Sequence, residues 1–216
     1  MKKIWAALLL TAALAAGPAA MAAQPGLGPT NDGPVISVEA ERGPVAGKYP
    51  VWKGGTALQR ARINSAIEAE LSAYYDHIMK LNENGPVTGT IAWDMGENGK
   101  DGVVSFVLYE STYPKGAAHP TTYVKGLTFD SLGYRITRHQ VLYMTTDDTA
   151  DEIDARVKAE AAERQIPLFP DSFGRPEAWP QEFYIGRDGK LYFVFQQYDI
   201  APYAAGWIAI NPTPVK

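Results

Sequence analysis

The stretch from Glu182 to Ile210 constrains the fold most, because it holds three short β-prone runs separated by turn residues. Phe183 to Ile185 and Leu191 to Phe195 flank Gly186-Arg187-Asp188-Gly189. An Asp-Gly turn between two such runs predicts a β-hairpin. Trp207 to Ile210 is a third run and is followed by Asn-Pro, which ends it. The stretch therefore predicts a hairpin and one further strand, rich in aromatic residues that supply much of the core.

Helical spacing appears in three other places. Apolar residues recur at helical intervals from Thr56 to Leu81, Thr56 is a candidate N-cap, and the sequence NENGP follows. Asp151 to Arg164 begins with acidic residues and has basic ones later, which the helix dipole favours. Ile136 to Leu142 predicts a short helix between these two.

The remaining β-prone runs alternate between apolar and polar residues. They are Val35–Ala40, Lys48–Trp52, Val87–Trp93, Val103–Tyr109 and Thr121–Phe129. Pro50 predicts an edge position for the second run, because proline cannot donate to a ladder. Runs of strands separated by single helices predict an α+β fold. We expect an antiparallel or mixed sheet meander, with one long helix laid on it and a second helix packed on it.

The N-terminus has the pattern of a secretory signal peptide. Lys2 and Lys3 precede an apolar run from Ile4 to Ala16, and Ala20-Met21-Ala22 resembles a cleavage site. The apolar run is shorter than the roughly 20 residues of a spanning helix, although an uncleaved anchor remains the alternative. We expect residues 1–22 to be a signal peptide, residues 23–34 a flexible lead-in rich in Gly and Pro, and no transmembrane segment after cleavage. The chain is then periplasmic or secreted.

The absence of cysteine and the negative net charge limit the kinds of function that the chain can have. The chain has no cysteine, which excludes disulfides, thiolate metal sites and thiol nucleophiles. Its formal net charge is -4, and loss of Lys2 and Lys3 takes it to about -6. This acidic balance favours cationic partners and predicts that nucleic acid is not a ligand.

His119 is the candidate for a special residue. It lies in Gly116-Ala117-Ala118-His119-Pro120, between two predicted strands, and imidazole is readily tuned for proton transfer or binding near neutral pH. Alternatively, His119 has a structural role, in which its ring donates a hydrogen bond to a backbone carbonyl and fixes the conformation of the loop. A hydrolase would combine His119 with a carboxylate such as Asp130, since no Gly-x-Ser-x-Gly elbow is present.

Metal and cofactor motifs are absent from the sequence. The three histidines, at positions 77, 119 and 139, lack metal-ligand spacing. The loop from Asp94 to Gly102 resembles a calcium loop in composition, but Ser105 stands where the bidentate glutamate belongs. Glycine loops that cradle phosphate are also missing. We therefore expect neither a metal nor a cofactor.

The aromatic residues near the C-terminus form either part of the hydrophobic core or a binding surface. Tyr198 and Tyr203 flank a loop that contains Asp199 and Pro202. A rigid loop lined with aromatic residues is the kind of surface that binds a protein or a glycan.

Two segments together carry a family resemblance. They are Gly116 to Pro120 with Gly126-Leu127-Thr128-Phe129-Asp130, and Phe183-Tyr184-Ile185 with Gln197 to Gly206. The pair resembles the RsiV-type extracytoplasmic domain, a domain of unknown function shared by the anti-sigma factor RsiV and accessory modules of peptidoglycan deacetylases. The resemblance implies an α+β module that recognises a ligand at the cell envelope, which in the RsiV branch is lysozyme.

The resemblance covers nearly all of the chain after the predicted signal peptide. It implies an N-terminal strand and helix part over residues 35–93 and a C-terminal part over 94–216, as one compact unit or two small subdomains. Only three residues precede the apolar run, so we expect no cytoplasmic anti-sigma segment. No deacetylase domain accompanies the module in this sequence, so deacetylase chemistry is not expected either. We predict an exported, non-enzymatic binding module for a protein or cell-wall glycan, with candidate ligand-binding residues His119, Tyr123, Tyr198, Asp199 and Tyr203.

Overall fold

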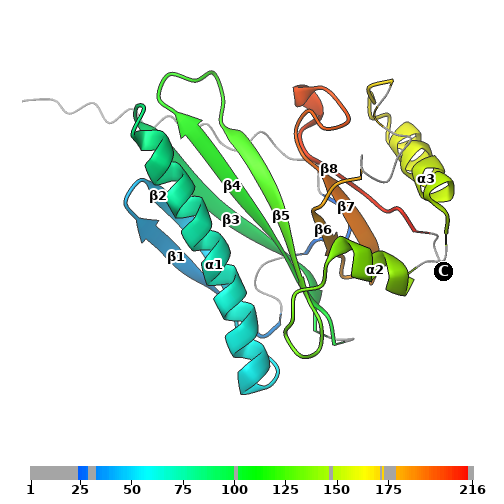
Figure 1. Ribbon diagram of the computed structural model, residues 1–216, viewed down its shortest axis with the longest axis horizontal. Coiled ribbons are helices and arrows are strands. Elements are labelled where there is room, and N and C mark those ends of the chain that lie inside the picture. The colour runs from blue at the N-terminus through cyan, green and yellow to red at the C-terminus, as the bar shows by residue number, and fades with distance from the viewer. Residues whose placement is uncertain are drawn as a thin grey trace, which may run out of the picture.

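The computed structural model describes residues 24–28, 33–99, 102–145, 148–170, 172 and 179–213. The predicted signal peptide, residues 1–22, lies outside this part of the chain, as do Lys100 and Asp101 of the loop that resembles a calcium loop. Helices and strands alternate in groups rather than strictly (Figure 1), so the predicted α+β class is confirmed.

A mixed five-stranded sheet forms the first half of the molecule. Its strands are β1 (Val35–Arg42), β2 (Val45–Trp52), β3 (Val87–Asn98), β4 (Val104–Pro114) and β5 (Thr121–Phe129), in that spatial order. All neighbours are antiparallel except β2 and β3, which run parallel over Val45–Gly47 and Gly89–Ile91. A parallel pair needs a crossover, and the long helix provides it.

Helix α1 (Ala57–Asn82) is this crossover and covers one face of the sheet (Figure 1). Thr56 caps it as predicted, accepting a hydrogen bond from the Gln59 N–H at 3.2 Å. Ile63, Ile67 and Ile78 are fully buried against the strands. Their helical spacing is the signal that predicted the helix, so its position on the sheet follows from the sequence.

The edge position predicted from Pro50 is half correct. β2 lies between β1 and β3, but its pairing with β3 ends at Gly47. Beyond that point, the side chain of Asn64 on α1 accepts from the Trp52 N–H at 2.8 Å and donates to the Trp52 carbonyl at 3.0 Å. Pro50 stands on this same edge, so its missing N–H removes no ladder bond.

A separate three-stranded sheet lies against the other face of the first. Its strands are β6 (Phe183–Ile185), β7 (Leu191–Phe195) and β8 (Ile208–Ile210), in antiparallel order, and the predicted hairpin and third strand are confirmed. A 3-10 turn, η2 (Tyr203–Ala205), precedes β8. Val107, Val124, Tyr184, Val194 and Trp207 pack between the two sheets.

Glycine permits close contact between the sheets. A Cβ atom at Gly126 would lie 1.6 Å from the Phe183 carbonyl oxygen, and one at Gly96 would lie 2.2 Å from that of Ile185. The backbone of β6 therefore crosses the first sheet where two strands lack side chains. Ser105, between them, accepts from the Ile185 N–H at 3.1 Å.

The outer face of the small sheet is covered by α2 (Arg138–Thr145) and α3 (Ala150–Glu163), which gives the order helix, sheet, sheet, helices (Figure 1). The second predicted helix thus packs on the second sheet. The five-stranded sheet is completed by β5, and the three-stranded sheet follows it in the chain. A boundary at residue 93 falls inside β3, which pairs with β4 well past that point.

Part of the predicted flexible lead-in is held in place. Gly28 donates its N–H to the Met95 carbonyl at 3.1 Å, and Gly26 accepts from the Arg187 N–H at 2.8 Å. The Pro25 carbonyl accepts from the Tyr184 hydroxyl. Residues 24–28 therefore lie along the junction of the two sheets, because buried strand edges there need partners. Residues 29–32 lie outside the described part of the chain.

Candidate functional site

The structure brings three of the predicted site residues together. His119, in the β4–β5 loop, stacks on Tyr203 with ring centroids 4.0 Å apart, and Tyr198 lies 5.6 Å from Tyr203. His119 is exposed and Tyr198 is 61% exposed. We call these three residues the aromatic platform.

Side chains from the β7–β8 connection hold the platform against the outer edge of β5. Gln196 accepts from the Val124 N–H at 2.8 Å and donates to the Val124 carbonyl at 2.7 Å. Gln197 accepts from the Thr122 N–H at 3.4 Å. An unpaired strand edge is otherwise free to pair with another chain. These two glutamines occupy backbone groups of the β5 edge and also hold the β7–β8 connection in place.

Asp199 has a structural partner. Its carboxylate accepts from the Gln196 N–H at 2.7 Å and closes the turn that holds Tyr198 at a positive φ of 70°. The Tyr203 hydroxyl donates to the Pro120 carbonyl at 3.1 Å, and the Nδ1 atom of His119 lies 3.3 Å from the same oxygen. The segment resembling the RsiV type therefore shapes the loop and also presents aromatic rings.

The pairing of His119 with Asp130 is not formed. The two residues flank opposite ends of β5, and nine extended residues span roughly 30 Å. Asp130 instead accepts from the N–H groups of Leu132 and Tyr134 at 2.9 and 2.8 Å. It closes the turn after β5 and plays no part at the platform.

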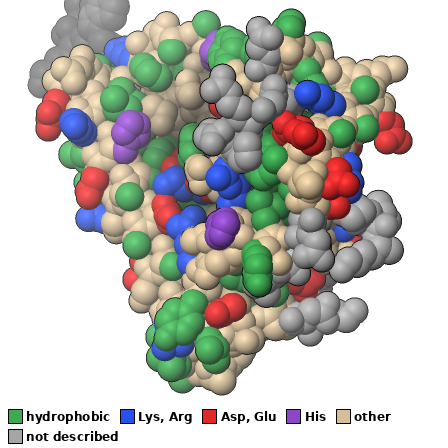
Figure 2. All heavy atoms as spheres, turned by 45° about the vertical axis from the view of Figure 1, so that its right-hand side comes forward, with side chains coloured by type: hydrophobic (Ala, Val, Ile, Leu, Met, Phe, Trp, Pro, Cys, Tyr) green, Lys and Arg blue, Asp and Glu red, His purple; other side chains and the backbone are tan. Residues whose placement is uncertain are grey.

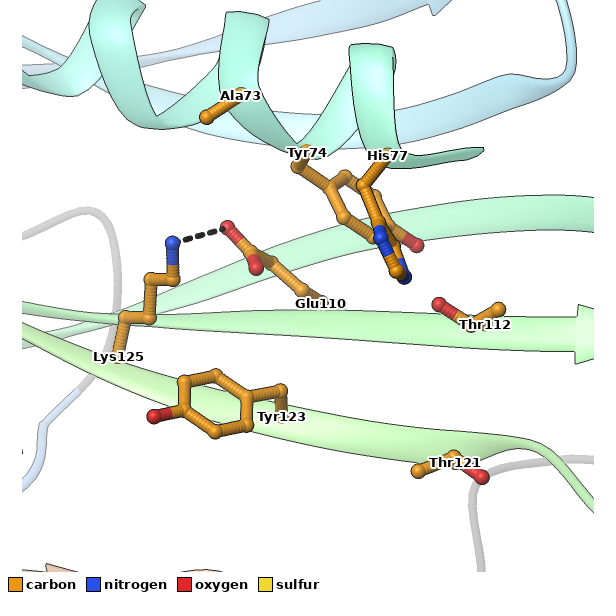
Figure 3. A pocket seen from close by; sticks show the side chains of 8 residues that line it. All are labelled: Ala73, Tyr74, His77, Glu110, Thr112, Thr121, Tyr123 and Lys125. Atoms are coloured by element: carbon orange, nitrogen blue, oxygen red, sulfur yellow. Dashed lines mark ion pairs between the residues drawn. The ribbon is translucent and has the colours of Figure 1, made fainter. Parts of the chain in front are cut away.

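A pocket of about 400 Å³ opens between α1 and the strands β4 and β5. The helix contributes Ala73, Tyr74 and His77, which point toward the sheet in Figure 3. The strands contribute Glu110, Thr112, Thr121, Tyr123 and Lys125. We call this the helix–sheet pocket. Of the predicted site residues, only Tyr123 lines it, and that ring is 43% exposed.

Two charged residues that line the pocket, Glu110 and Lys125, belong to a larger network of ion pairs. Lys125 contacts Glu70 at 2.6 Å and Glu110 at 3.6 Å, and Arg135 contacts the other oxygen of Glu70. Glu182 accepts from the Gly126 N–H at 2.9 Å nearby. Basic and acidic side chains also lie close together in the middle of the face shown in Figure 2. The network joins α1, β4 and β5 to the start of the second sheet.

Lys125 contacts two carboxyl groups, Glu70 and Glu110, whose pKa values are shifted in opposite directions. Burial raises the pKa of Glu110 to about 7, although Lys125 opposes the shift. Burial also works against ionisation of Glu70, but hydrogen bonds from Lys125 and Arg135 outweigh it and lower the pKa of that carboxyl. Glu70 is thus a fixed anion, and Glu110 changes its protonation near neutral pH.

This carboxyl pair lacks the arrangement of a glycosidase pair. A glycosidase needs one protonated carboxyl and a second whose free oxygen can attack or activate water. Both oxygens of Glu70 are taken by Lys125 and Arg135. What the pocket offers is Glu110, whose Oε1 is buried and accepts no hydrogen bond within the described structure.

Glu110 and Lys125 were not identified from the sequence as site residues. A signal was present, since Thr121, Tyr123 and Lys125 alternate along β5 and point to the face that α1 covers. Only Lys125 of the three is largely covered, since Thr121 and Tyr123 remain exposed, and a partly buried charged residue is informative. The partner strand and the helix could not be assigned to that face from sequence.

Within the described ranges, no helix is both long and apolar enough to cross a bilayer. No group of three or more His, Asp or Glu residues there could hold a metal ion.

A segment of about one third of the chain resembles a known domain family. Residues 142–211 match a family model described as a protein of unknown function, DUF3298. This region runs from the end of α2 through α3 and the three-stranded sheet. No curated protein matches the sequence. Among the solved structures, a DUF3298 family member from Bacteroides fragilis matches with a TM-score of 0.48 and 16% identity, over 85% of this chain and 91% of its own.

Proposed function

We propose that this chain is an exported, non-enzymatic binding module of the cell envelope that recognises a cationic, lysozyme-like protein through the aromatic platform. One observation carries the proposal. His119 and Tyr203, which are 84 positions apart in the chain, stack at 4.0 Å on the surface and leave Tyr198 exposed beside them.

The platform has the properties of a binding surface. Tyrosine is enriched among interface residues that dominate binding energy, and a fixed ring loses little conformational entropy on binding. The glutamines at 196 and 197 and the Tyr203 hydroxyl bond hold the loop before any partner arrives. Burial in a core does not account for Tyr198, which remains 61% exposed.

Charge selects the class of partner. The formal net charge of -4 becomes about -6 without the predicted signal peptide, and exposed Asp199 lies next to Tyr198 in the platform loop. Opposite charge accelerates association with a cationic protein. The resemblance to the RsiV type implies the same partner, since lysozyme is cationic.

Calorimetric titration of the mature chain with lysozyme tests the proposal. We expect binding that His119→Ala and Tyr198→Ala each weaken about tenfold, the effect of losing one well-placed interface contact. Tyr143→Ala is the matched control, because Tyr143 is 84% exposed on α2 and is expected to change nothing.

Three outcomes contradict the proposal. One is the absence of lysozyme binding at high micromolar concentration. Another is sedimentation with peptidoglycan that His119→Ala abolishes, which assigns the platform to a glycan instead. The third is cell-wall degradation in a zymogram by the wild-type chain that is lost in His119→Ala, which supports the hydrolase alternative.

A further inference from the structure

The helix–sheet pocket contains a buried oxygen that needs a donor. Glu110 is 6% exposed, lines the pocket and has no hydrogen bond to its Oε1 atom. Its nearest cation, the Nζ atom of Lys125, is 3.6 Å away (Figure 3), beyond hydrogen-bond length. Buried carboxylate oxygens are usually satisfied, since leaving one without a donor costs free energy. Because Glu110 lines the pocket, a ligand there can donate a hydrogen bond to its carboxyl group.

The surrounding charges select a neutral donor. Lys125 already lies beside Glu110, and an ammonium group placed on the same oxygen would meet it in a partly buried site, where like charges repel strongly. An anion would lie close to Glu70, whose lowered pKa keeps that carboxyl ionised, and to Glu110 beside it. A hydroxyl or amide N–H can donate to Glu110 without either penalty.

The rest of the lining suits a polyhydroxylated ring. Tyr123 presents a ring that is 43% exposed on one wall, and apolar C–H faces can pack against such a ring. Thr112 and Thr121 carry hydroxyls that can donate or accept, and His77 adds an imidazole from the helix. The volume of about 400 Å³ lies at the small end of the range of roughly 300–1,000 Å³ for ligand pockets.

We infer that the helix–sheet pocket is a binding site for a neutral saccharide, in which a sugar hydroxyl or amide donates to Glu110 and the ring packs against Tyr123. This site is separate from the aromatic platform and goes beyond the proposed protein recognition. It requires no chemistry on the sugar, because Glu70 is held by two cations.

A titration of the ¹⁵N-labelled chain, followed by NMR, tests this inference. The probes are the β-1,4-linked tetramer of N-acetylglucosamine, which is neutral, and the tetramer of glucosamine, which has the same backbone but carries ammonium groups. We expect the neutral tetramer to bind more tightly and to shift amide signals of β4, β5 and the second half of α1. We expect Tyr123→Ala and Glu110→Gln each to weaken it about tenfold, as loss of one contact implies.

Tyr143→Ala, which removes an exposed ring on α2 that belongs to neither site, is the control and is expected to leave saccharide binding unchanged. The inference fails if neither tetramer shifts signals at millimolar concentration, if the cationic tetramer binds as tightly as the neutral one, or if the shifts map to the platform. It also fails if Tyr123→Ala and Glu110→Gln, folded by their own spectra, bind like the wild type. Because none of these readouts uses lysozyme, they leave the test of the proposed function independent.

Discussion

Replacing Glu110 with glutamine is expected to remove a fall in stability between weakly acidic and weakly basic pH. Burial raises the pKa of Glu110 from its ordinary 4.5 to about 7. Between pH 4.5 and about 7, Glu110 keeps its proton in the folded chain but has released it in the unfolded chain. Stability from this group is therefore fully present below pH 4.5, falls as pH rises toward 7, and stays reduced above it.

The size of the effect follows from the shift. Each unit of pKa difference corresponds to about 1.4 kcal/mol. Integrated from pH 5 to pH 8, a rise from 4.5 to about 7 makes the folded wild type lose roughly 2.5 kcal/mol. Glutamine has nearly the same shape and does not titrate, so the variant lacks this loss.

The groups that face Glu110 determine which pH window is informative. They are Glu70, Tyr74 and His77 on α1, Lys125 on β5, and Glu182 before β6. The lowered pKa of Glu70 acts with the opposite sign, because its contribution is lost as pH falls below 4.5. Burial raises the pKa of Glu182, which has the same sign as Glu110 but is present in both proteins. The difference between the wild type and Glu110→Gln, measured from pH 5 to pH 8, therefore isolates the contribution of Glu110 to stability.

Urea unfolding at pH 5, 6, 7 and 8 measures the difference. The free energy of unfolding of the wild type should fall relative to Glu110→Gln by roughly 2.5 kcal/mol across this range. Glu41→Gln changes an exposed carboxyl on β1 and should follow the wild-type profile. Parallel profiles for wild type and Glu110→Gln would refute the reasoning, because they would mean that Glu110 ionises equally easily in both states.

Three further substitutions test a contact between the two sheets, the N-cap of α3 and the edge of β5. Gly126→Ala should destabilise by about 3 kcal/mol or more in urea unfolding, since its Cβ would overlap the Phe183 carbonyl, whereas Gly116→Ala, with open space around it, should cost about 1 kcal/mol for its positive φ. Thr149→Ala removes the capping box of α3 and should lower stability by about 1 kcal/mol, and Thr149→Ser should restore it. Gln196→Ala should cost about 1–3 kcal/mol and speed hydrogen exchange of its bonded amide on β5; unchanged exchange would contradict the edge role.

Local patterns predicted most of the secondary structure because each depends on neighbouring residues. The helix from Thr56 and the hairpin around Asp188-Gly189 formed as expected, with the cap and the turn residues in their predicted roles. The sequence did not predict that the C-terminal strands form a second sheet. That depends on Gly96 and Gly126, whose missing side chains admit β6, and a glycine in a strand does not reveal what approaches it.

The spatial arrangement of the candidate site residues could be predicted from the sequence only in part, because it too depends on contacts between distant segments. His119, Tyr198 and Tyr203 were selected from loops, and they meet because both loops lie at the same end of β5. Glu110 was not selected, because its importance comes from burial under α1 and from neighbours on two other elements. Long-range burial of a polar group leaves only a weak trace in the alternation of one strand.

Strand β5 connects the two proposed sites and separates their roles. Its outer edge is bonded to Gln196 and Gln197, which fix the platform, while Thr121, Tyr123 and Lys125 point from the same strand into the helix–sheet pocket. The edge bonds use backbone groups of Thr122 and Val124, whereas the pocket uses the side chains of the alternate residues, so one strand serves both surfaces without sharing a residue. A ligand in the pocket would contact β5 and not the platform rings. No platform residue lines the pocket, but burial raises the pKa of the Tyr123 hydroxyl, and the charges of Glu182 and of Asp199 in the platform loop raise it further. Coupling between the sites can therefore pass through the charge of Asp199 as well as through the backbone of β5 and its bonded edge.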